Sequence, residues 1–384
     1  MGNRQNKIYL HLAKMSGLEQ KYVQEAFDTN WVAPLGPNVD AFETSLENYL
    51  GEHKYVTVLS SGTAALHIGL RMAEVDKGDE VICQSWTFAA SANPIVYLGA
   101  TPIFVDSEKE SWNMSHELLE MAISDRIRKT GKKPKAIVAV DLYGMPAELG
   151  KIETIAEKYD IPLIEDAAEA LGSEFAGKKC GTFGKFGVLS FNGNKMITTS
   201  GGGALICDSE KDKRRARYFA TQAREPFPYY HHENIGYNYR MSNICAGIGL
   251  GQMSVLDSHI LHHREIASLY SSLFKDVDGI KVHENPSKKF KSNYWLTTIV
   301  IDKKKTGLTP EAVRLRLEEL NVESRHLWKP MHLQPVFKSA PAYVNGISEA
   351  LFEEGLCLPS GPWVTEEDVE YIADEIKKLI HVAV

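Results

Sequence analysis

The sequence predicts an α/β protein built on a large, mostly parallel sheet. From about residue 56 onward, short apolar runs alternate with helix-length segments, an order typical of a sheet covered by helices on both faces. The apolar runs are continuous rather than alternating, as in strands that are buried on both sides. The 384 residues exceed what one hydrophobic core usually serves, so we expect two domains, residues 1–255 and 256–384.

The expected strands of the large sheet follow one another through the first half of the chain. They are the runs at residues 56–59, 80–84, 102–106, 136–140 and 162–166, with helices between them such as 64–74 and 147–159. Ligands of parallel sheets gather at the carboxyl ends of the strands. We therefore expect the chemistry of this protein to lie directly after these runs.

The last third of the chain predicts a smaller α+β domain. Residues 242–275 are mostly helical in pattern, and residues 295–301 are typical of a strand. A further helix is expected after Thr309, which suits an N-cap, with Pro310 at the first helical position.

The composition is that of an ordinary soluble globular protein. The chain has 43 Lys and Arg against 50 Asp and Glu, a net charge of −7 that gives no support to a nucleic-acid or membrane partner. No apolar run is long enough to span a bilayer, and the N-terminus lacks the apolar region of a secretory signal. Five scattered cysteines without a CxxC pair are typical of reduced thiols, so we expect a cytoplasmic protein.

One lysine stands in a setting that suits covalent chemistry. Lys195 follows an apolar run that ends near Ser190, and it precedes three glycines at residues 201–203. A lysine whose pKa is lowered can form a Schiff base with an aldehyde cofactor, and glycines let other groups approach the backbone closely. Taken alone, an exposed loop lysine is the commoner explanation.

Two further segments would complement such a lysine. Residues 60–65 join an expected strand to a helix, and a helix N-terminus with hydroxyl groups can bind a phosphate. Asp166 ends another expected strand, where a buried carboxylate needs a cation such as a protonated pyridine nitrogen. Ordinary helix capping is the alternative for each segment. Together with Lys195 they predict a site for pyridoxal 5′-phosphate.

Paired histidines at residues 231–232 and 262–263, with His259, raise the question of a metal site. No Cys or Glu-rich ligand pattern accompanies them, so we expect no metal. The glycine-rich residues 181–187 lack the GxGxxG pattern of a dinucleotide site.

These motifs resemble the DegT/DnrJ/EryC1/StrS family of fold-type I, pyridoxal-phosphate-dependent nucleotide-sugar aminotransferases, which are aspartate aminotransferase-like in fold. The resemblance extends from about Ile8 to the C-terminus. It is carried by SGTAAL at 61–66, Thr87 and Phe88 with Asn93, EDAAE at 165–169, SFNGNK at 190–195, GYNYRMS at 236–242 and WKPMH at 328–332. Residues 30–36, 190–203 and 327–335 look most like the bacillosamine-pathway C4 aminotransferase, which acts on UDP-4-keto-6-deoxy-N-acetylglucosamine.

The resemblance implies a role for each matching residue. Lys195 would bond covalently to the cofactor and carry protons during transamination, and Asp166 would hydrogen-bond the pyridine nitrogen. The other implied cofactor contacts are Gly62, Thr63 and Ser190 at the phosphate, Asn238 at the phosphate of the neighbouring subunit, Phe88 on the ring face and Glu169 near the ring hydroxyl. The implied substrate contacts are Arg240, Trp328, Lys329 and His332.

The resemblance also implies a homodimer with active sites shared across the interface. We expect the amino group of glutamate to reach C4 of a UDP-4-keto-6-deoxy-N-acetylhexosamine, giving a UDP-4-amino-4,6-dideoxy sugar, with pyridoxamine 5′-phosphate formed between the two half-reactions. Amination of another keto sugar, GDP- or dTDP-linked and at C3 or C4, is the first alternative. The others are a sugar dehydratase, which would carry His in place of Lys195, and a sugar-nucleotide-binding protein without turnover.

Overall fold

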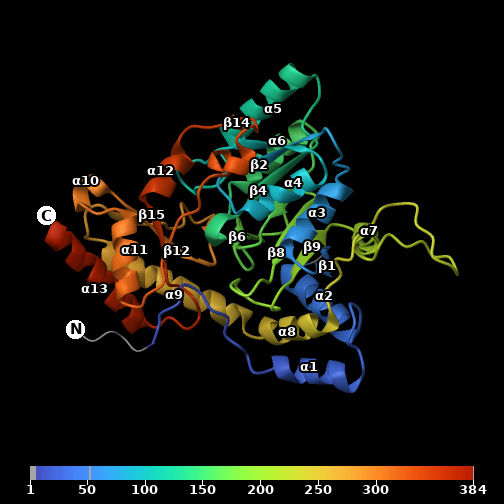
Figure 1. Cartoon of the computed structure of the whole chain (residues 1–384), viewed down its shortest axis with the longest axis horizontal. Coiled ribbons are helices and arrows are strands. Elements are labelled where there is room, and N and C mark those ends of the chain that lie inside the picture. The colour runs from blue at the N-terminus through green and yellow to red at the C-terminus, as the bar shows by residue number, and fades with distance from the viewer. Residues whose placement is uncertain (1–5, 52, 384) are drawn as a thin grey trace.

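The computed structural model describes residues 6–51 and 53–383 and contains the predicted large sheet (Figure 1). Its strands are β1 (Tyr55–Leu59), β2 (Glu80–Gln84), β3 (Thr101–Val105), β4 (Ala136–Val140), β5 (Leu163–Asp166), β8 (Phe186–Ser190), β9 (Gly203–Cys207) and β14 (Ala342–Tyr343). They lie in the order β1-β9-β8-β5-β4-β2-β3-β14, and only β9 runs against its neighbours. The five strands expected from apolar runs are confirmed, each within one residue at either end.

Helices cover both faces of this sheet, as predicted. One face packs against α2 (Pro37–Leu50), α5 (His116–Thr130) and α6 (Leu149–Lys158). The other face packs against α3 (Gly62–Met72), α4 (Asn93–Tyr97) and α7 (Glu210–Ala220). Successive residues of one strand therefore enter different cores: Ile82 contributes to the first, and Val81 and Cys83 to the second. Burial on both faces explains why these strands are continuously apolar.

A smaller antiparallel sheet lies in the C-terminal third. It contains β10 (Ile280–Val282), β12 (Thr297–Ile301), β15 (Gly355–Leu358) and β13 (Arg325–His326), in that order, with α9 (Leu256–Phe274), α11 (Pro310–Glu319) and α13 (Glu366–Ala383) around its core. The predicted start of α11 is confirmed, because the Thr309 side chain accepts a hydrogen bond from the Ala312 amide and Pro310 opens the helix.

The remaining elements connect or extend these two sheets. The helices are α1 (Glu19–Asp28), α8 (Asn243–Met253), α10 (Lys303–Thr306) and α12 (Ile347–Glu354), with 3₁₀ turns η1 (Ala89–Ser91), η2 (Leu142–Gly144), η3 (Met331–Leu333) and η4 (Pro335–Phe337). Strands β11 (Phe290–Lys291), β6 (Glu174–Phe175) and β7 (Lys178–Lys179) form a third, small sheet. Within the described residues no single helix could span a membrane by length and composition; only α8 and α9 taken together, bent by 59°, pass that test.

Two segments cross the proposed domain boundary at residue 255. Ile8, near the N-terminus, bridges to Val322 and belongs to the core of the smaller domain. In the opposite direction, β14 leaves the C-terminal part and pairs with β3 at the edge of the large sheet. These crossings bring the N-terminal segment and the smaller domain to the carboxyl ends of the large sheet, where chemistry was expected.

Candidate active site

A cavity of about 700 Å³ lies at the carboxyl ends of the parallel strands. Its walls come from the N-terminus of α3, the end of β5, the loop after β8, strand β13 and the N-terminal residues 10–12. Eight residues predicted from the sequence line it: Gly62, Thr63, Phe88, Asp166, Glu169, Ser190, Lys195 and Trp328. The fold therefore brings together groups that are up to 266 positions apart in the chain.

Lys195 is held between a carboxylate and an aromatic ring. Its Nζ lies 3.0 Å from Glu169 Oε1 and 4.0 Å from the centre of the Trp295 ring. Each of these partners is itself fixed, because Glu169 Oε2 accepts a hydrogen bond from the Tyr143 amide and Trp295 Nε1 donates to the Asn194 carbonyl. Burial raises the pKa of Glu169, although the charge of Lys195 opposes that shift. The amine is thereby held at the cavity wall.

Asp166 is a buried carboxylate with a defined orientation. Its Oδ2 accepts a hydrogen bond from Ser91 Oγ at 2.7 Å, and its Oδ1 accepts one from the Ala168 amide at 3.2 Å. Thr87 Oγ1 lies 2.7 Å from Ser91 Oγ and extends this chain. Burial raises the pKa of Asp166 despite these hydrogen bonds. Sequence reasoning missed Ser91, because its contact depends on the turn η1 folding back over the end of β5.

The N-terminus of α3 forms a cradle suited to a phosphate. Ser61 caps the helix by accepting a hydrogen bond from the Ala64 amide, while the amides of Gly62 and Thr63 in the first turn have no carbonyl of the preceding turn to bond. A Cβ on Gly62 would lie 3.1 Å from Ser190 Cβ, and a Cβ on Gly203 would lie 2.3 Å from the Gly62 nitrogen. At Gly203 only glycine allows the strand and the helix to approach so closely, and at Gly62 a side chain would crowd Ser190.

These residues fit pyridoxal phosphate. Lys195 offers an amine for its aldehyde, Asp166 a buried acceptor for its ring nitrogen and the α3 N-terminus a site for its phosphate. Phe88 adds an aromatic surface inside the cavity, with 59% of the residue exposed.

Comparison with known proteins agrees with this geometry. The sequence profile of the DegT/DnrJ/EryC1/StrS aminotransferase family matches residues 14–377. The chain belongs to this family. It is 46% identical over 379 residues to EpsN of Bacillus subtilis (strain 168), whose name describes a pyridoxal phosphate-dependent aminotransferase; the match covers 98% of this chain and 96% of EpsN. GDP-perosamine synthase of Escherichia coli O157:H7 is 38% identical, with 97% and 98% of the two chains covered.

A crystal structure of a DegT/DnrJ/EryC1/StrS aminotransferase from Brucella abortus has the same fold. It superimposes with a TM-score of 0.88 at 30% identity, covering 94% of this chain and 95% of that one. The fold-type I architecture predicted from the sequence is confirmed. The protein is a nucleotide-sugar aminotransferase that uses pyridoxal phosphate.

Three residues that the family resemblance offered as substrate contacts lie away from the cavity. His332 Nδ1 lies 2.6 Å from Ser85 Oγ, and its Nε2 lies 3.1 Å from Glu349 Oε1, so both ring nitrogens already have protein partners. Lys329 is exposed and does not line the cavity, whereas the neighbouring Trp328 does. Arg240 is the third of these residues.

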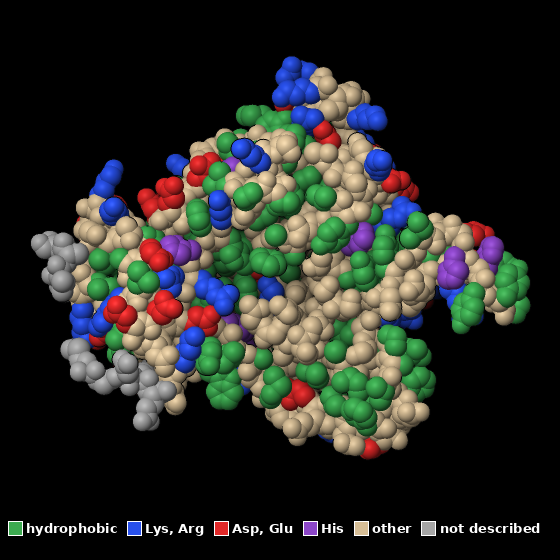
Figure 2. Space-filling model, viewed as in Figure 1, with side chains coloured by type: hydrophobic (Ala, Val, Ile, Leu, Met, Phe, Trp, Pro, Cys, Tyr) green, Lys and Arg blue, Asp and Glu red, His purple; other side chains and the backbone are tan. Residues whose placement is uncertain are grey.

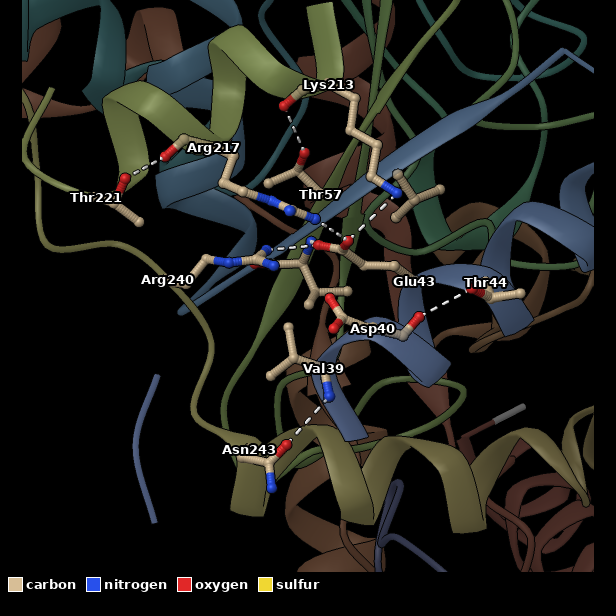
Figure 3. A network of polar contacts seen from close by, with 12 residues as sticks. Val39, Asp40, Glu43, Thr44, Thr57, Lys213, Arg217, Thr221, Arg240 and Asn243 are labelled. Carbon is tan, nitrogen blue, oxygen red and sulfur yellow. Dashed lines mark hydrogen bonds and ion pairs between the residues drawn. The ribbon is translucent and has the colours of Figure 1, made fainter. Parts of the chain in front are cut away.

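Arg240 takes part in a buried ion-pair network rather than facing the cavity (Figure 3). Its guanidinium pairs with Glu43 of α2 and donates to the Val58 carbonyl of β1. Glu43 also pairs with Arg217 at 2.9 Å and Lys213 at 3.3 Å. Although burial raises the pKa of Glu43, these cations outweigh it and lower that pKa. Arg240 is thus held by a structural ion pair, and the substrate contact expected for it stays a prediction.

Sequence reasoning missed four charged residues or histidines of the cavity wall: His11, Glu323, and Arg325 and His326 of β13. Arg325 pairs with Glu323 at 2.7 Å and keeps most of its side chain exposed. The signal in the sequence was weak for the two residues of β13, because both precede the recognised WKPMH motif and stand in a segment without a clear period.

Asn238, expected to serve a neighbouring subunit, is exposed and does not line the cavity of its own chain. It forms a bridge with Thr221, and the adjacent Tyr239 carbonyl accepts a hydrogen bond from the Ser60 amide at 2.8 Å. The segment that carries Asn238 is thus paired to the chain at the start of the phosphate cradle.

One group of three possible metal ligands is found in the described part of the chain: Asp141, Glu165 and Cys180, all buried. The paired histidines do not form such a group there. Burial raises the pKa of both Asp141 and Glu165, and the negative charge of Asp141 raises that of Glu165 further. The raised pKa values favour a proton on this pair of carboxyl groups, and the absence of a metal stays a prediction.

Proposed function

We propose that this aminotransferase transfers the amino group of glutamate to C4 of a UDP-4-keto-6-deoxy-N-acetylhexosamine. The observation that carries the catalytic part is the meeting of Lys195, Asp166 and the α3 N-terminus around one cavity. The sugar is supported by residues 30–36, 190–203 and 327–335, which resemble the branch that acts on this substrate. The alternative is a GDP-linked keto sugar, because a relative 38% identical is named GDP-perosamine synthase.

Lys195 is the proposed proton carrier. Pyridoxal phosphate, when bound, supplies the electron sink that makes the proton on the donor's Cα removable. Lys195 Nζ, fixed 3.0 Å from Glu169 Oε1 at the cavity wall, would accept that proton and deliver it again. Such transfer requires a group within hydrogen-bond reach of the reacting atom, which a tethered amine provides. Glu169 would position the amine between these transfers.

Asp166 would keep the ring nitrogen of the cofactor protonated. Because the carboxylate is buried, a positive partner stabilises its charge more than water could. Ser91 and the Ala168 amide orient it without neutralising it. Gly62, Thr63 and Ser190 would hold the phosphate, and Phe88 would cover the ring face.

We propose a homodimer in which Asn238 completes the phosphate site of the other subunit. Figure 2 shows hydrophobic side chains gathered over α1 and at the tip of the loop between α7 and α8. The exposed apolar residues of these two regions are Phe27, Trp31, Val32, Leu35, Phe227, Tyr229, Tyr230 and Ile235. Clusters of exposed apolar side chains of this kind are typical of protein interfaces.

An absorbance titration tests the catalytic proposal. The purified protein, loaded with pyridoxal phosphate, should change its visible band when glutamate is added and should release 2-oxoglutarate. Keto sugars linked to UDP, GDP and dTDP should then be compared as acceptors, with NMR of the product to locate the new amine. We expect the UDP-linked 4-keto-6-deoxy-N-acetyl sugar to be preferred. A preference for a GDP-linked sugar would contradict the substrate proposal, and no response to glutamate would contradict the donor.

Subunit mixing tests the shared site. In a dimer that contains one Lys195→Ala and one Asn238→Ala subunit, a site with intact Lys195 and the partner's intact Asn238 forms again. The mixture should therefore exceed the average activity of the two separate variants. Activity equal to that average would place Asn238 outside the neighbouring site.

A further inference from the structure

The N-terminal segment forms one wall of the active-site cavity through residues 10–12. Its backbone is anchored on the smaller domain. The Glu323 amide donates to the Ile8 carbonyl at 2.8 Å, and the Ser360 amide donates to the Leu10 carbonyl at 3.0 Å. The side chain of His11 is therefore placed beside the cavity by a backbone that is fixed through the residues before it.

His11 is a buried polar residue whose ring nitrogens lack partners. Only 7% of the residue is exposed, and neither Nδ1 nor Nε2 has a hydrogen-bond partner among the described residues. Its ring stacks on His263, with centres 5.1 Å apart and planes 23° apart. His263 differs in part, because its Nδ1 lies 3.1 Å from the Tyr294 carbonyl, although its Nε2 also lacks a partner among the described residues. Buried polar atoms without partners are costly, so one on a cavity wall points to a partner that enters the cavity.

His11 lies close to the reacting centre. The centre of its ring is 6.4 Å from that of Trp295, and the Trp295 ring is the one that lies 4.0 Å from Lys195 Nζ. Burial first, and then the charge of Lys195 and of His259, lower the pKa of His11 to about 3. The imidazole is consequently neutral near pH 7, with one nitrogen that donates and one that accepts.

We propose that His11 is a specificity residue that hydrogen-bonds an uncharged polar substituent of the acceptor sugar, a hydroxyl or an acylamino group. This inference rests on the proposed function. A neutral imidazole matches such substituents, which both donate and accept hydrogen bonds. The carboxylates of the amino donor instead favour a cation such as Arg or Lys, so His11 should distinguish acceptor sugars and have little influence on glutamate.

Equilibrium binding to the holoenzyme tests this role. Calorimetry with UDP-N-acetylglucosamine and with UDP separates contacts to the sugar from contacts to the nucleotide; GDP-mannose and GDP form the corresponding pair for the alternative substrate. His11→Phe keeps an aromatic ring for the stack and removes both nitrogens. It should raise the Kd of the sugar nucleotide about 10-fold and leave that of the free nucleotide unchanged. His11→Gln, which keeps a donor and an acceptor, should recover most of the affinity.

His283→Phe is the matched control. His283 is also buried and stacks on Trp112 at 3.7 Å, but it does not line the cavity. This variant should leave both Kd values unchanged. Kinetics supply a second readout: His11→Phe should raise KM for the keto sugar by the same factor, with the glutamate-driven colour change as fast as in wild type.

Three results would overturn the proposal. Unchanged sugar-nucleotide affinity in His11→Phe would mean that the ring only packs. Equal weakening of sugar nucleotide and free nucleotide, or a slower reaction with glutamate, would mean that His11 shapes the whole cavity. Wild-type protein that responds to glutamate and yet binds neither sugar nucleotide would overturn the acceptor part of the proposed function itself, an outcome visible before any variant is made.

Discussion

Two charge clusters in this protein each combine carboxylates with basic side chains, but in opposite proportions. At the cavity, two carboxylates, Asp166 and Glu169, lie near one lysine, Lys195. Beside β1, one carboxylate, Glu43, pairs with three cations, of which Arg240 is the most deeply buried (Figure 3). The first cluster opens on the cavity, whereas the second, here called the closed cluster, does not line it. At the first cluster, a ligand that enters the cavity can supply the missing positive charge.

The pKa shifts of the two clusters have opposite signs for the same reason. Burial raises the pKa of Asp166 and Glu169 because nearby positive charge does not compensate it. The pKa of Glu43 is lowered because its cations do. Groups held in an unfavourable charge state next to a cavity are candidates for function, whereas saturated pairs are structural. Four experiments, in order of decreasing effect, test this distinction.

Replacement of Lys195 should have the largest effect. Lys195→Ala removes the proposed proton carrier, so kcat should fall by about 10⁴-fold or more while the fold is retained. Steady-state kinetics measure kcat, and circular dichroism shows whether the fold is retained. Lys213→Ala, at the lysine of the closed cluster, is the control and should change kcat less than about threefold. Substantial turnover in Lys195→Ala would mean that Lys195 is not the proton carrier.

Replacement of Asp166 should have the second largest effect on kcat. Asp166→Asn keeps the shape and loses the charge that stabilises a protonated ring nitrogen, so kcat should fall about 10²–10³-fold. Ser91→Ala, which removes only the hydrogen bond to Asp166 Oδ2, should cost about 10-fold. Equal kcat values for wild type and Asp166→Asn would mean that the carboxylate does not meet the cofactor nitrogen.

Replacement of Glu43 should affect stability instead of chemistry. Glu43→Gln leaves Arg240 buried without a negative partner, and the free energy of unfolding should fall by about 3 kcal/mol. Urea denaturation measures this change, and kcat of the folded fraction should stay near wild type. A large loss of kcat at unchanged stability would mean that Glu43 takes part in catalysis, and the distinction between the two clusters would be wrong.

The Asp141–Glu165 pair should give the smallest effect, a loss of stability as the pH rises through about 6. Burial raises the pKa of Asp141 to about 6 and raises that of Glu165, so the folded chain holds a proton that the unfolded chain releases near pH 4. The stability from this proton is complete below pH 4 and is lost as pH rises through 6. Between pH 5 and 8 wild type should lose about 1 kcal/mol relative to Glu165→Gln, whose amide replaces the proton.

Denaturation curves at several pH values check this expectation. Glu157→Gln, at an exposed carboxylate of α6, is the control and should follow the pH dependence of wild type. If the curves of wild type and Glu165→Gln stay parallel across this range, the pair does not share a proton.

The sequence predicted the strands and the cofactor groups well, for identifiable reasons. Strands β1 to β5 of the sheet are buried on both faces, so each is a continuous apolar run that can be recognised locally. Lys195 and Asp166 stand at the ends of such runs, and their position in a parallel sheet brings them to one edge. Thr309 and Pro310 mark a helix start through local capping alone.

Contacts between distant segments were predicted less well. The motif around Arg240 suggested a substrate contact, yet the side chain meets Glu43, 197 residues away. His332 is in a recognised motif, and its ring is held by Ser85 and Glu349. Ser91, Arg325 and His11 reach the site from segments with no distinctive pattern. Which side chains become partners of this kind depends on how helices and strands pack, and neither the spacing nor the type of the residues in the sequence shows it.

The sequence by itself determined the order of strands and helices, the chemical groups of the cofactor site and the family, because local apolar patterns, caps and motifs are properties of short segments. The tertiary structure decided which carboxylates are neutralised by cations of the protein and which remain available to a ligand in the cavity. Whether Glu169 or Glu43 meets an excess of cations depends on the helices and strands that pack around each of them. Burial then converts that difference in neighbours into opposite pKa shifts, and so separates a reactive cluster from a structural one.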